Sequence, residues 1–358
     1  MVHKTKYTFP LLIALTALLA SACGDTFDAS DLGTTAPPNS YGDTSYVLQQ
    51  PIWTGFEEPA DVHLGFEPFI YVAERGAHRV TMLDVAGTVI GSSSEILRPT
   101  AISQDYRLDL LVCGEFDTTI GGRQATFGAI YRVHLVDAGH SIAGARVERV
   151  YFDALNPDRR FTGVTVLGDN SYYVTRTGPN NSSLVDPDDA VMLFNREDEL
   201  RPRVEWPGLS IDGTGLATMT VPTSISTISP YSSDFLFTQK GEKSLFRAQW
   251  ITQRTTGDIT QWESFYSPAR DGDLDLLRVS LFDRPEDITA DDAGNIFVID
   301  AGLDSLFRFT SSGFITQAFG GKEQFDEPEG VAYFDRTLYI ADTGNNRILR
   351  FVLSTELD

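Results

Sequence analysis

Acidic residues recur at one kind of position in this sequence, one or two places after a proline that opens a short β-like segment. The set comprises Asp61, Glu286, Asp287 and Glu329. Three of them, Asp61, Asp287 and Glu329, could supply hard oxygen ligands for Ca²⁺, although no motif in the sequence requires that ion. The alternative is that these side chains only support the fold, and the sequence leaves both interpretations open.

Histidine offers a second kind of chemistry, because zinc sites use imidazole nitrogens and need three or four converging ligands. His63 lies two residues after Asp61, whereas His78, His134 and His140 occupy unrelated positions. A lone histidine is more typical of a structural residue whose ring nitrogens are hydrogen-bonded than of a zinc ligand. The sequence also contains no GxSxG elbow, no CxxC pair and no P-loop, so catalytic residues and metal ligands stay unassigned.

The acidic residues belong to a repeated segment, which must position them. Its clearest copy is FDEPEGVAYFDRTLYIADTGNNRILRF, from Phe325 to Phe351, and weaker copies begin at Pro59, Pro99, Phe161, Pro222 and Pro285. Within each copy, apolar residues alternate with the period of a β-strand rather than a helix. A unit of about 42 residues that recurs in this way suits one blade of a propeller.

The last copy resembles a known repeat family. YIADTGNNRILRF with PEGVA upstream is similar to the NHL repeat, and IFVIDAGLDSLFRF is similar to a degenerate second copy. The resemblance covers most of the chain from about Tyr46 and implies an all-β, six-bladed β-propeller. An open β-solenoid is the structural alternative.

The two ends of the repeat region predict that the ring closes on itself. The sixth copy ends at Leu349 to Leu353 with its third strand, and no sequence remains for a fourth. Before the first copy, SYVLQQPIWTGFEEP matches the fourth-strand segment GFITQAFGGKEQFDEP of copy five. We therefore expect an amino-terminal strand at about Ser45 to Thr54 to complete the last blade and to remove its exposed edge.

The propeller topology predicts where a site would lie. Loops that enter the innermost strands share one face of the ring with loops between the second and third strands. Convergent side chains at the top of the central channel then form a ligand-binding cleft, for which the candidate residues are Asp61, His63, Arg176, Gln239, Glu286, Asp287 and Glu329. The cleft should be acidic on the side of blades one, five and six, with Arg176 opposite.

Two further features bear on this face. Acidic residues just after second strands, Glu74, Asp300 and Asp342, are expected to hold turns through backbone N–H groups rather than to bind a ligand. Long insertions after Cys113 and after Thr175 should form loops that wall off one side of the face.

The amino terminus predicts export and anchoring. Residues 1–22 carry Lys4 and Lys6, then LLIALTALLA, and small residues precede Cys23, which is typical of a signal peptide. The segment resembles a bacterial lipobox, which implies that Cys23 becomes lipidated and holds the protein on a membrane. An ordinary signal peptide is the alternative. Residues 23–44 should form a disordered acidic tether and residues 45–358 the propeller domain.

The composition limits the classes of binding partner that can be expected. A formal net charge of −22 argues against nucleic acid and anionic headgroups, so the lipid anchor would be the only membrane contact. Only one other cysteine, Cys113, is present, and an acylated Cys23 leaves it without a disulfide partner.

These features predict a monomeric lipoprotein of the bacterial cell envelope, anchored to the outer membrane and facing the periplasm or the surface. Its propeller would act as a binding or scaffolding module for an envelope protein, a peptide or a small-molecule ligand. No cofactor is expected, and Ca²⁺ remains open. The alternative is a calcium- or zinc-dependent hydrolase or lyase, similar to lactonase-type or amidating-lyase-type propellers.

Overall fold

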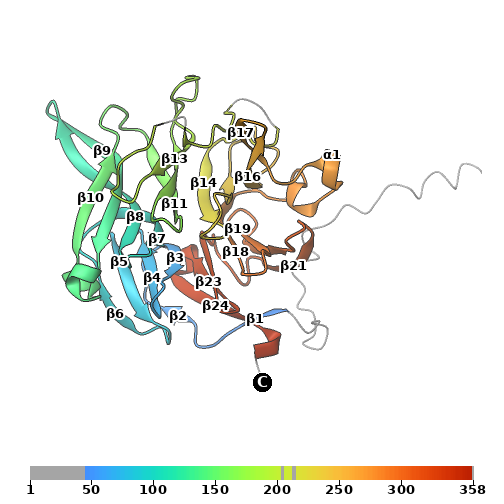
Figure 1. The fold of residues 1–358 in the computed structure, drawn as a ribbon. Coiled ribbons are helices and arrows are strands. Elements are labelled where there is room, and N and C mark those ends of the chain that lie inside the picture. The colour runs from blue at the N-terminus through green and yellow to red at the C-terminus, as the bar shows by residue number, and fades with distance from the viewer. Residues whose placement is uncertain (1–44, 203–204, 212–214, 357–358) are drawn as a thin grey trace, which may run out of the picture.

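Six antiparallel sheets surround one axis in the computed structural model, which describes residues 45–202, 205–211 and 215–356 (Figure 1). Each innermost strand packs against the innermost strands of both neighbouring blades, and the last blade packs against the first. The prediction of an all-β, six-bladed propeller is confirmed, and the open solenoid is excluded.

The blades follow the six sequence copies, each running outward from the axis. Blade one contains β3 (Pro59–Leu64), β4 (Phe69–Glu74), β5 (Arg79–Asp84) and β6 (Val89–Ser92). Blade two contains β7 (Leu97–Gln104), β8 (Leu110–Ile120), β9 (Arg123–His134) and β10 (Arg146–Phe152). Blade three contains β11 (Arg160–Val166), β12 (Tyr172–Thr177) and β13 (Ala190–Phe194).

The second half of the ring repeats this order. Blade four contains β14 (Pro222–Thr227), β15 (Phe235–Gln239), β16 (Ala248–Thr256) and β17 (Ile259–Ser264). Blade five contains β18 (Pro285–Ala290), β19 (Ile296–Asp300), β20 (Ser305–Phe309) and β21 (Ile315–Gly320). Blade six contains β22 (Gly330–Phe334), β23 (Thr337–Asp342) and β24 (Arg347–Leu353), and it is completed by β1 (Tyr46–Leu48) and β2 (Trp53–Thr54).

Helical structure is confined to single turns in the described ranges. The α-helix α1 spans Pro268–Asp271, and short 3₁₀ turns lie at Val136–Ala138, Ile142–Gly144, Asp275–Leu277, Thr343–Asn345 and Ser354–Glu356. No described helix has the length and apolarity needed to cross a membrane. The predicted signal peptide, Cys23 and the tether lie outside the described residues.

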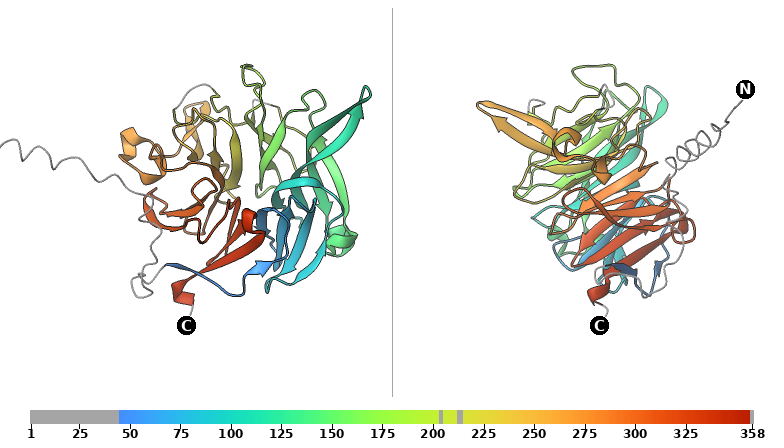
Figure 2. Two further views of the ribbon diagram at one scale, coloured as in Figure 1. Left: turned by 180° about the vertical axis from the view of Figure 1, so that it is seen from behind. Right: turned by 90° about the vertical axis from the view of Figure 1, so that its right-hand side faces the viewer.

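The insertion after Cys113 corrects one expectation, because it continues the sheet instead of forming a loop. Strands β8 and β9 stay paired as far as Ile120 and Arg123, and Gly121 and Gly122 turn the chain with φ angles of 57° and 80°. Glycine adopts such angles without strain. The β8–β9 hairpin projects beyond the ring in Figure 1, and the gold hairpin of β16 and β17 does so in the edge-on view of Figure 2.

The amino-terminal strands close the ring as predicted. Tyr46 pairs with Leu353, and Trp53 pairs with Ile348, so both segments lie along β24. Hydrophobic clusters fill the spaces between neighbouring blades, including one that joins Tyr46 to blades five and six. The edge of β24 that a three-stranded last blade would expose is therefore covered.

The pairing of β1 and β2 with β24 is called the clasp below, and Trp53 is its main anchor. Its indole is 5% exposed, lies 5.9 Å from the Tyr339 ring and 4.5 Å below the Arg350 guanidinium. Gly87 approaches so closely that a Cβ there would lie 2.2 Å from the indole, and its φ is 86°. Glycine is thus required for two independent reasons.

Replacing this indole tests the clasp. We expect Trp53→Ala to lower the free energy of unfolding by about 3–5 kcal/mol, because it removes a buried aromatic side chain. Chemical denaturation of the purified protein would measure the loss. The control Val89→Ala, at a side chain that is 58% exposed, should cost about 0.5 kcal/mol or less. Equal losses in the two variants would contradict an anchoring role for Trp53.

Candidate functional site

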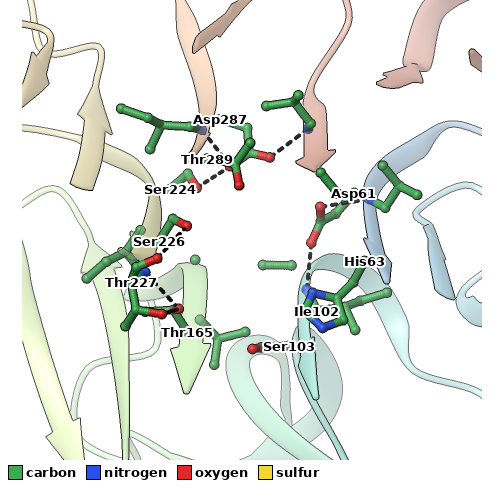
Figure 3. Close-up of a pocket in the computed structure, with 18 of the residues that line it drawn as sticks. Asp61, His63, Ile102, Ser103, Thr165, Ser224, Ser226, Thr227, Asp287 and Thr289 are labelled. Atoms are coloured by element: carbon green, nitrogen blue, oxygen red, sulfur yellow. Dashed lines mark hydrogen bonds between the residues drawn. The ribbon is translucent and has the colours of Figure 1, made fainter. Parts of the chain in front are cut away.

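A cavity of about 360 Å³ runs along the axis of the ring, lined by inner strands of all six blades (Figure 3). A second opening of about 320 Å³ shares part of this lining at the end where the inner strands begin. The shared residues are Ala60, Thr100, Thr162, Thr223, Glu286 and Glu329. The two spaces adjoin along the axis and are together called the channel, with its charged end at the second opening. Phe66, Tyr106 and Tyr333 lie at the other end of the inner strands.

Asp61 and Asp287 occupy the same repeat position in blades one and five, and each bonds to the next blade. Asp61 accepts backbone N–H bonds from Val62 and Ile102, both at 2.7 Å. Asp287 accepts the N–H of Ile288 at 2.8 Å and that of Val331 at 2.7 Å. The carboxylates therefore connect blade one to blade two and blade five to blade six.

A β-bulge explains why these side chains turn toward the channel. The strand register shifts between Pro59 and Asp61 and again between Pro285 and Asp287. Bulges of this kind redirect a side chain relative to its strand. The Ser224 hydroxyl, at the corresponding position of blade four, donates to Asp287. The sequence signal for this geometry is the proline two residues before the inward-facing position.

The channel environment raises the pKa of both carboxyl groups. Burial raises the pKa of Asp61 to about 6. Burial together with the negative charge of Asp61 raises the pKa of Asp287 to about 8. Removal from water disfavours the charged form, and within the described residues no lysine or arginine lines the cavity to compensate.

His63 also lines the channel, two residues along β3 from Asp61. Its Nε2 accepts the backbone N–H of Gln104 at 3.1 Å, so the neutral imidazole carries its proton on Nδ1. Burial lowers the pKa of His63 to about 4. The side chain is therefore an uncharged hydrogen-bond donor near neutral pH, and it links blade one to blade two as a wall residue.

The charged end of the channel is not uniformly acidic, which corrects the expected charge pattern. Glu329 binds Arg75 through two hydrogen bonds of 2.6 and 2.9 Å. Glu286 pairs with Lys240 at 2.8 Å, and Arg160 of blade three also lines this opening. The carboxylates of blades five and six are thus neutralised by cations from neighbouring blades.

Two predicted site residues, Arg176 and Gln239, do not line the channel. Arg176 is 2% exposed and donates to the Asp188 carbonyl at 3.0 Å. Gln239 is fully buried, accepts the Thr220 N–H at 2.7 Å and donates to the Phe246 carbonyl at 2.7 Å. Both side chains hold neighbouring loops in place.

The residues that face the channel mouth are the next ones in the chain, Thr177 and Lys240. Successive side chains near a strand end point to opposite sides, so a slip of one residue exchanges the two faces. Arg75 follows Glu74 in the same way. The repeat spacing could have identified these mouth-facing residues, because Arg75, Thr177 and Lys240 occupy the same position in their repeats.

The interpretation of Glu74, Asp300 and Asp342 as turn-holding residues is confirmed. Glu74 accepts the Glu57 N–H at 2.9 Å. Asp342 accepts the Asp326 N–H at 2.8 Å and pairs with Arg347. Asp300 accepts four backbone N–H bonds, from Asp283, Arg284, Gly302 and Leu303.

The channel residues do not fit a calcium or zinc site. Across the described ranges, no group of three or more His, Cys, Asp and Glu side chains is placed to hold a metal. Calcium requires six to eight oxygen ligands, whereas Asp61 and Asp287 use their oxygens for backbone N–H groups and Glu329 binds Arg75. The predicted trio of oxygen ligands is therefore not assembled.

Comparisons with known proteins agree with the fold. Residues 325–351 match the NHL repeat family. A gluconolactonase from Xanthomonas campestris is 12% identical over 84% of this chain and 88% of that one, with a TM-score of 0.54. Regucalcin, a calcium-binding protein from Agrobacterium tumefaciens, is 10% identical over 86% and 93%, with a TM-score of 0.53.

A virginiamycin B lyase from Staphylococcus aureus is 12% identical over 86% of this chain and 100% of that one, with a TM-score of 0.51. No protein of curated function matches the sequence. Identities this low establish a shared propeller fold and leave the activity to be argued from the site.

Removal of a turn-holding carboxylate tests the assignment of these acids. We expect Asp300→Ala to lower the free energy of unfolding by about 3 kcal/mol or more, because four backbone donors lose their acceptor. Denaturant titration would measure this loss against Glu323→Ala, at an exposed position. A cost for Asp300→Ala no larger than that of the control would rule out the structural role.

The raised pKa of Asp287 has a consequence for stability. A pKa shifted from 3.8 to about 8 means that the folded state holds the proton more tightly than the unfolded state. The stabilisation is fully present below about pH 4 and disappears as the pH rises through 8. Asp287→Asn should therefore become more stable relative to wild type between pH 5 and pH 9.

Thermal midpoints of the two proteins across this pH range would measure the effect. Asp137→Asn, at an exposed position, should show a difference from wild type that does not depend on pH. A pH-independent difference for Asp287→Asn would contradict the raised pKa.

Proposed function

We propose that this protein is a non-catalytic binding module of the bacterial cell envelope, which takes a small polar ligand into the central channel of its propeller. The proposal rests on one observation, a polar cavity of about 360 Å³ that residues from all six blades line. Cavities of about 300–1,000 Å³ with a few well-placed polar groups are typical of small-ligand sites.

Polar groups of the wall that are free to bind a ligand support this proposal. Ser103, Thr289 and His63 line the cavity, and no other described protein group bonds to the two hydroxyls or to the His63 Nδ1. A ligand with complementary donors and acceptors would satisfy them.

The proposed anchoring is compatible with access to the channel. Acylated Cys23 and the tether at residues 23–44 would join the propeller at β1, which is the outermost strand of its sheet. The attachment point is then on the rim of blade six, and neither end of the channel is covered by it. Such a monomer would stand on the outer membrane, facing the periplasm or the cell surface.

A metal-dependent hydrolase or lyase is the alternative function. The names of the gluconolactonase and the virginiamycin B lyase among the structural neighbours favour it. The dispersed carboxylates disfavour it, because within the described residues no three of them converge on one point while Asp61 and Asp287 hold their backbone N–H bonds.

Metal content distinguishes the two functions. We expect purified full-length protein, prepared without chelator, to contain no stoichiometric divalent metal by elemental analysis. EDTA should leave its thermal midpoint unchanged, because no ion contributes to folded-state stability. Aliphatic lactones should also be hydrolysed no faster with the protein than in buffer alone.

The contrary result is equally clear. One equivalent of divalent metal that only chelation removes, together with lactone turnover that stops on its removal, would overturn the binding module and establish the hydrolase. Equilibration with excess Ca²⁺ before analysis controls for loss of a weakly held ion during purification.

A further inference from the structure

The cavity is lined by three carboxyl groups that have no cationic partner among the described residues. Asp61, Asp287 and Asp292 line the cavity, and in the described ranges none of them has an ion-pair partner. Glu286 and Glu329 are neutralised by Lys240 and Arg75, which line the charged end of the channel. The electrostatics of the interior therefore disfavour an anionic ligand and favour a cationic one.

Exposed aromatic rings surround the end of the channel that lacks ion pairs. Phe66 and Tyr106 stack with ring centroids 4.5 Å apart, although they are 56% and 40% exposed. Tyr231, at 96% exposure, lies close enough to affect the pKa of Tyr106. Tyr333 and Asp292 also line this end. Aromatic faces beside a carboxylate attract organic cations, because ring quadrupoles and charge act together.

A buried polar group points into the space between these two ends. Ser103 is 6% exposed, and its hydroxyl has no hydrogen-bond partner within the described residues. Figure 3 shows it on the channel wall opposite Asp287, with His63 and Asp61 nearby. The acidic residues are therefore part of a formed cavity with an unused hydrogen-bonding group, rather than an isolated surface cluster.

We propose that the channel binds a linear organic polycation of the alkyl diamine or polyamine class. One ammonium group would bind Asp61 and Asp287, and the other would lie at Asp292, in the same cavity that Phe66 and Tyr106 line. This assignment rests on the proposed binding function and names its ligand class. Methylene groups between the charges would contact the apolar wall at Ile102, Val164 and Ile288, which line the cavity.

The spacing of two carboxyl groups limits the length of the ligand. Asp287 lies in β18 and Asp292 lies two residues beyond the end of that strand, five residues further along the chain. Their separation is at most about 16 Å at about 3.3 Å per residue, and hydrogen bonds of about 2.8 Å at each end leave at most about 10 Å between the terminal nitrogens. An eight-carbon diamine is long enough for this upper limit, whereas a four-carbon diamine is not.

The protonation behaviour of the channel agrees with a cationic ligand. The pKa of Asp61 is raised to about 6 and that of Asp287 to about 8. The other titratable groups that face this pair are His63, with a pKa near 4, buried Cys113, with a raised pKa, and ion-paired Glu286 and Glu329. A bound ammonium would favour the ionised carboxylates, so binding should strengthen from pH 5 to pH 9 and release protons near pH 7.

Three molecules of similar length provide the test, because their end groups are cationic, neutral and anionic. Isothermal titration of full-length protein with 1,8-diaminooctane should give saturable binding. The neutral 1,8-octanediol and the anionic octanedioate should each bind at least tenfold more weakly, and so should 1,4-diaminobutane. Proton release is measured by repeating the titration in buffers of different ionisation enthalpy.

Variants locate the binding site. Asp61→Asn and Asp287→Asn should each weaken 1,8-diaminooctane binding at least tenfold at pH 8, and Phe66→Ala should weaken it severalfold. Asp137→Asn removes a surface charge and should have no effect. Phe66 is exposed, so its replacement also keeps the test valid if a channel variant fails to fold, which thermal unfolding would reveal.

The outcomes separate this inference from the binding function. Equal or tighter binding of the diol or the dioate would overturn the cation assignment and leave a channel-binding module. Diamine binding that survives both Asp61→Asn and Phe66→Ala would be adsorption to the acidic surface and would also overturn it. No binding of any probe would overturn the assignment, whereas the metal and turnover measurements decide the binding function itself.

Discussion

Six sheets can meet on one axis only if the side chains at the narrowest level of the ring are small. Gly163 and Gly330 meet this constraint, since a Cβ at either position would approach backbone atoms of the next blade to 2.8 Å. Ala101 and Ser224 occupy the same repeat position in two other blades. The remaining two blades carry Asp61 and Asp287, which fit because their oxygens accept backbone N–H bonds from the neighbouring inner strand. Packing and polarity are thus decided by the same ring of residues.

Three physical classes can be separated among the described acidic residues of the channel and the blade turns. Those just after the second strands are buried acceptors of backbone N–H groups, as Asp300 shows. Those at the charged end of the channel are paired with cations, as Glu329 is with Arg75. The third class lies inside the channel and has no positive partner within the described residues, and burial raises the pKa of Asp61 and Asp287 within it. The net charge of −22 says little about function until these classes are separated, because most carboxylates with resolved contacts serve the fold.

The sequence was sufficient for the architecture because the repeat and the strand period report backbone structure directly. The copy from Phe325 to Phe351 predicted the blade boundaries, and the match before Pro59 predicted the clasp. The direction in which each side chain points was harder to predict from the sequence. Arg176 and Gln239 were placed one residue out of register with the channel mouth, since the end of a strand determines which side chain faces inward. The cations at Arg75 and Lys240 pair across blade boundaries, and such pairs join residues far apart in the chain. The exposed stack of Phe66 and Tyr106 likewise forms only when two blades come together.

The clasp has a consequence for the order in which the protein is made. Blade six contains β1 and β2 from the start of the described chain and β24 from its end. Its sheet cannot be completed until Leu353 has been synthesised. A chain emerging from the ribosome therefore contains the sequence of five blades before it can close the ring. The central channel, which requires β22 beside β3, is the last feature to form, so any ligand it holds meets a finished protein and not a nascent one.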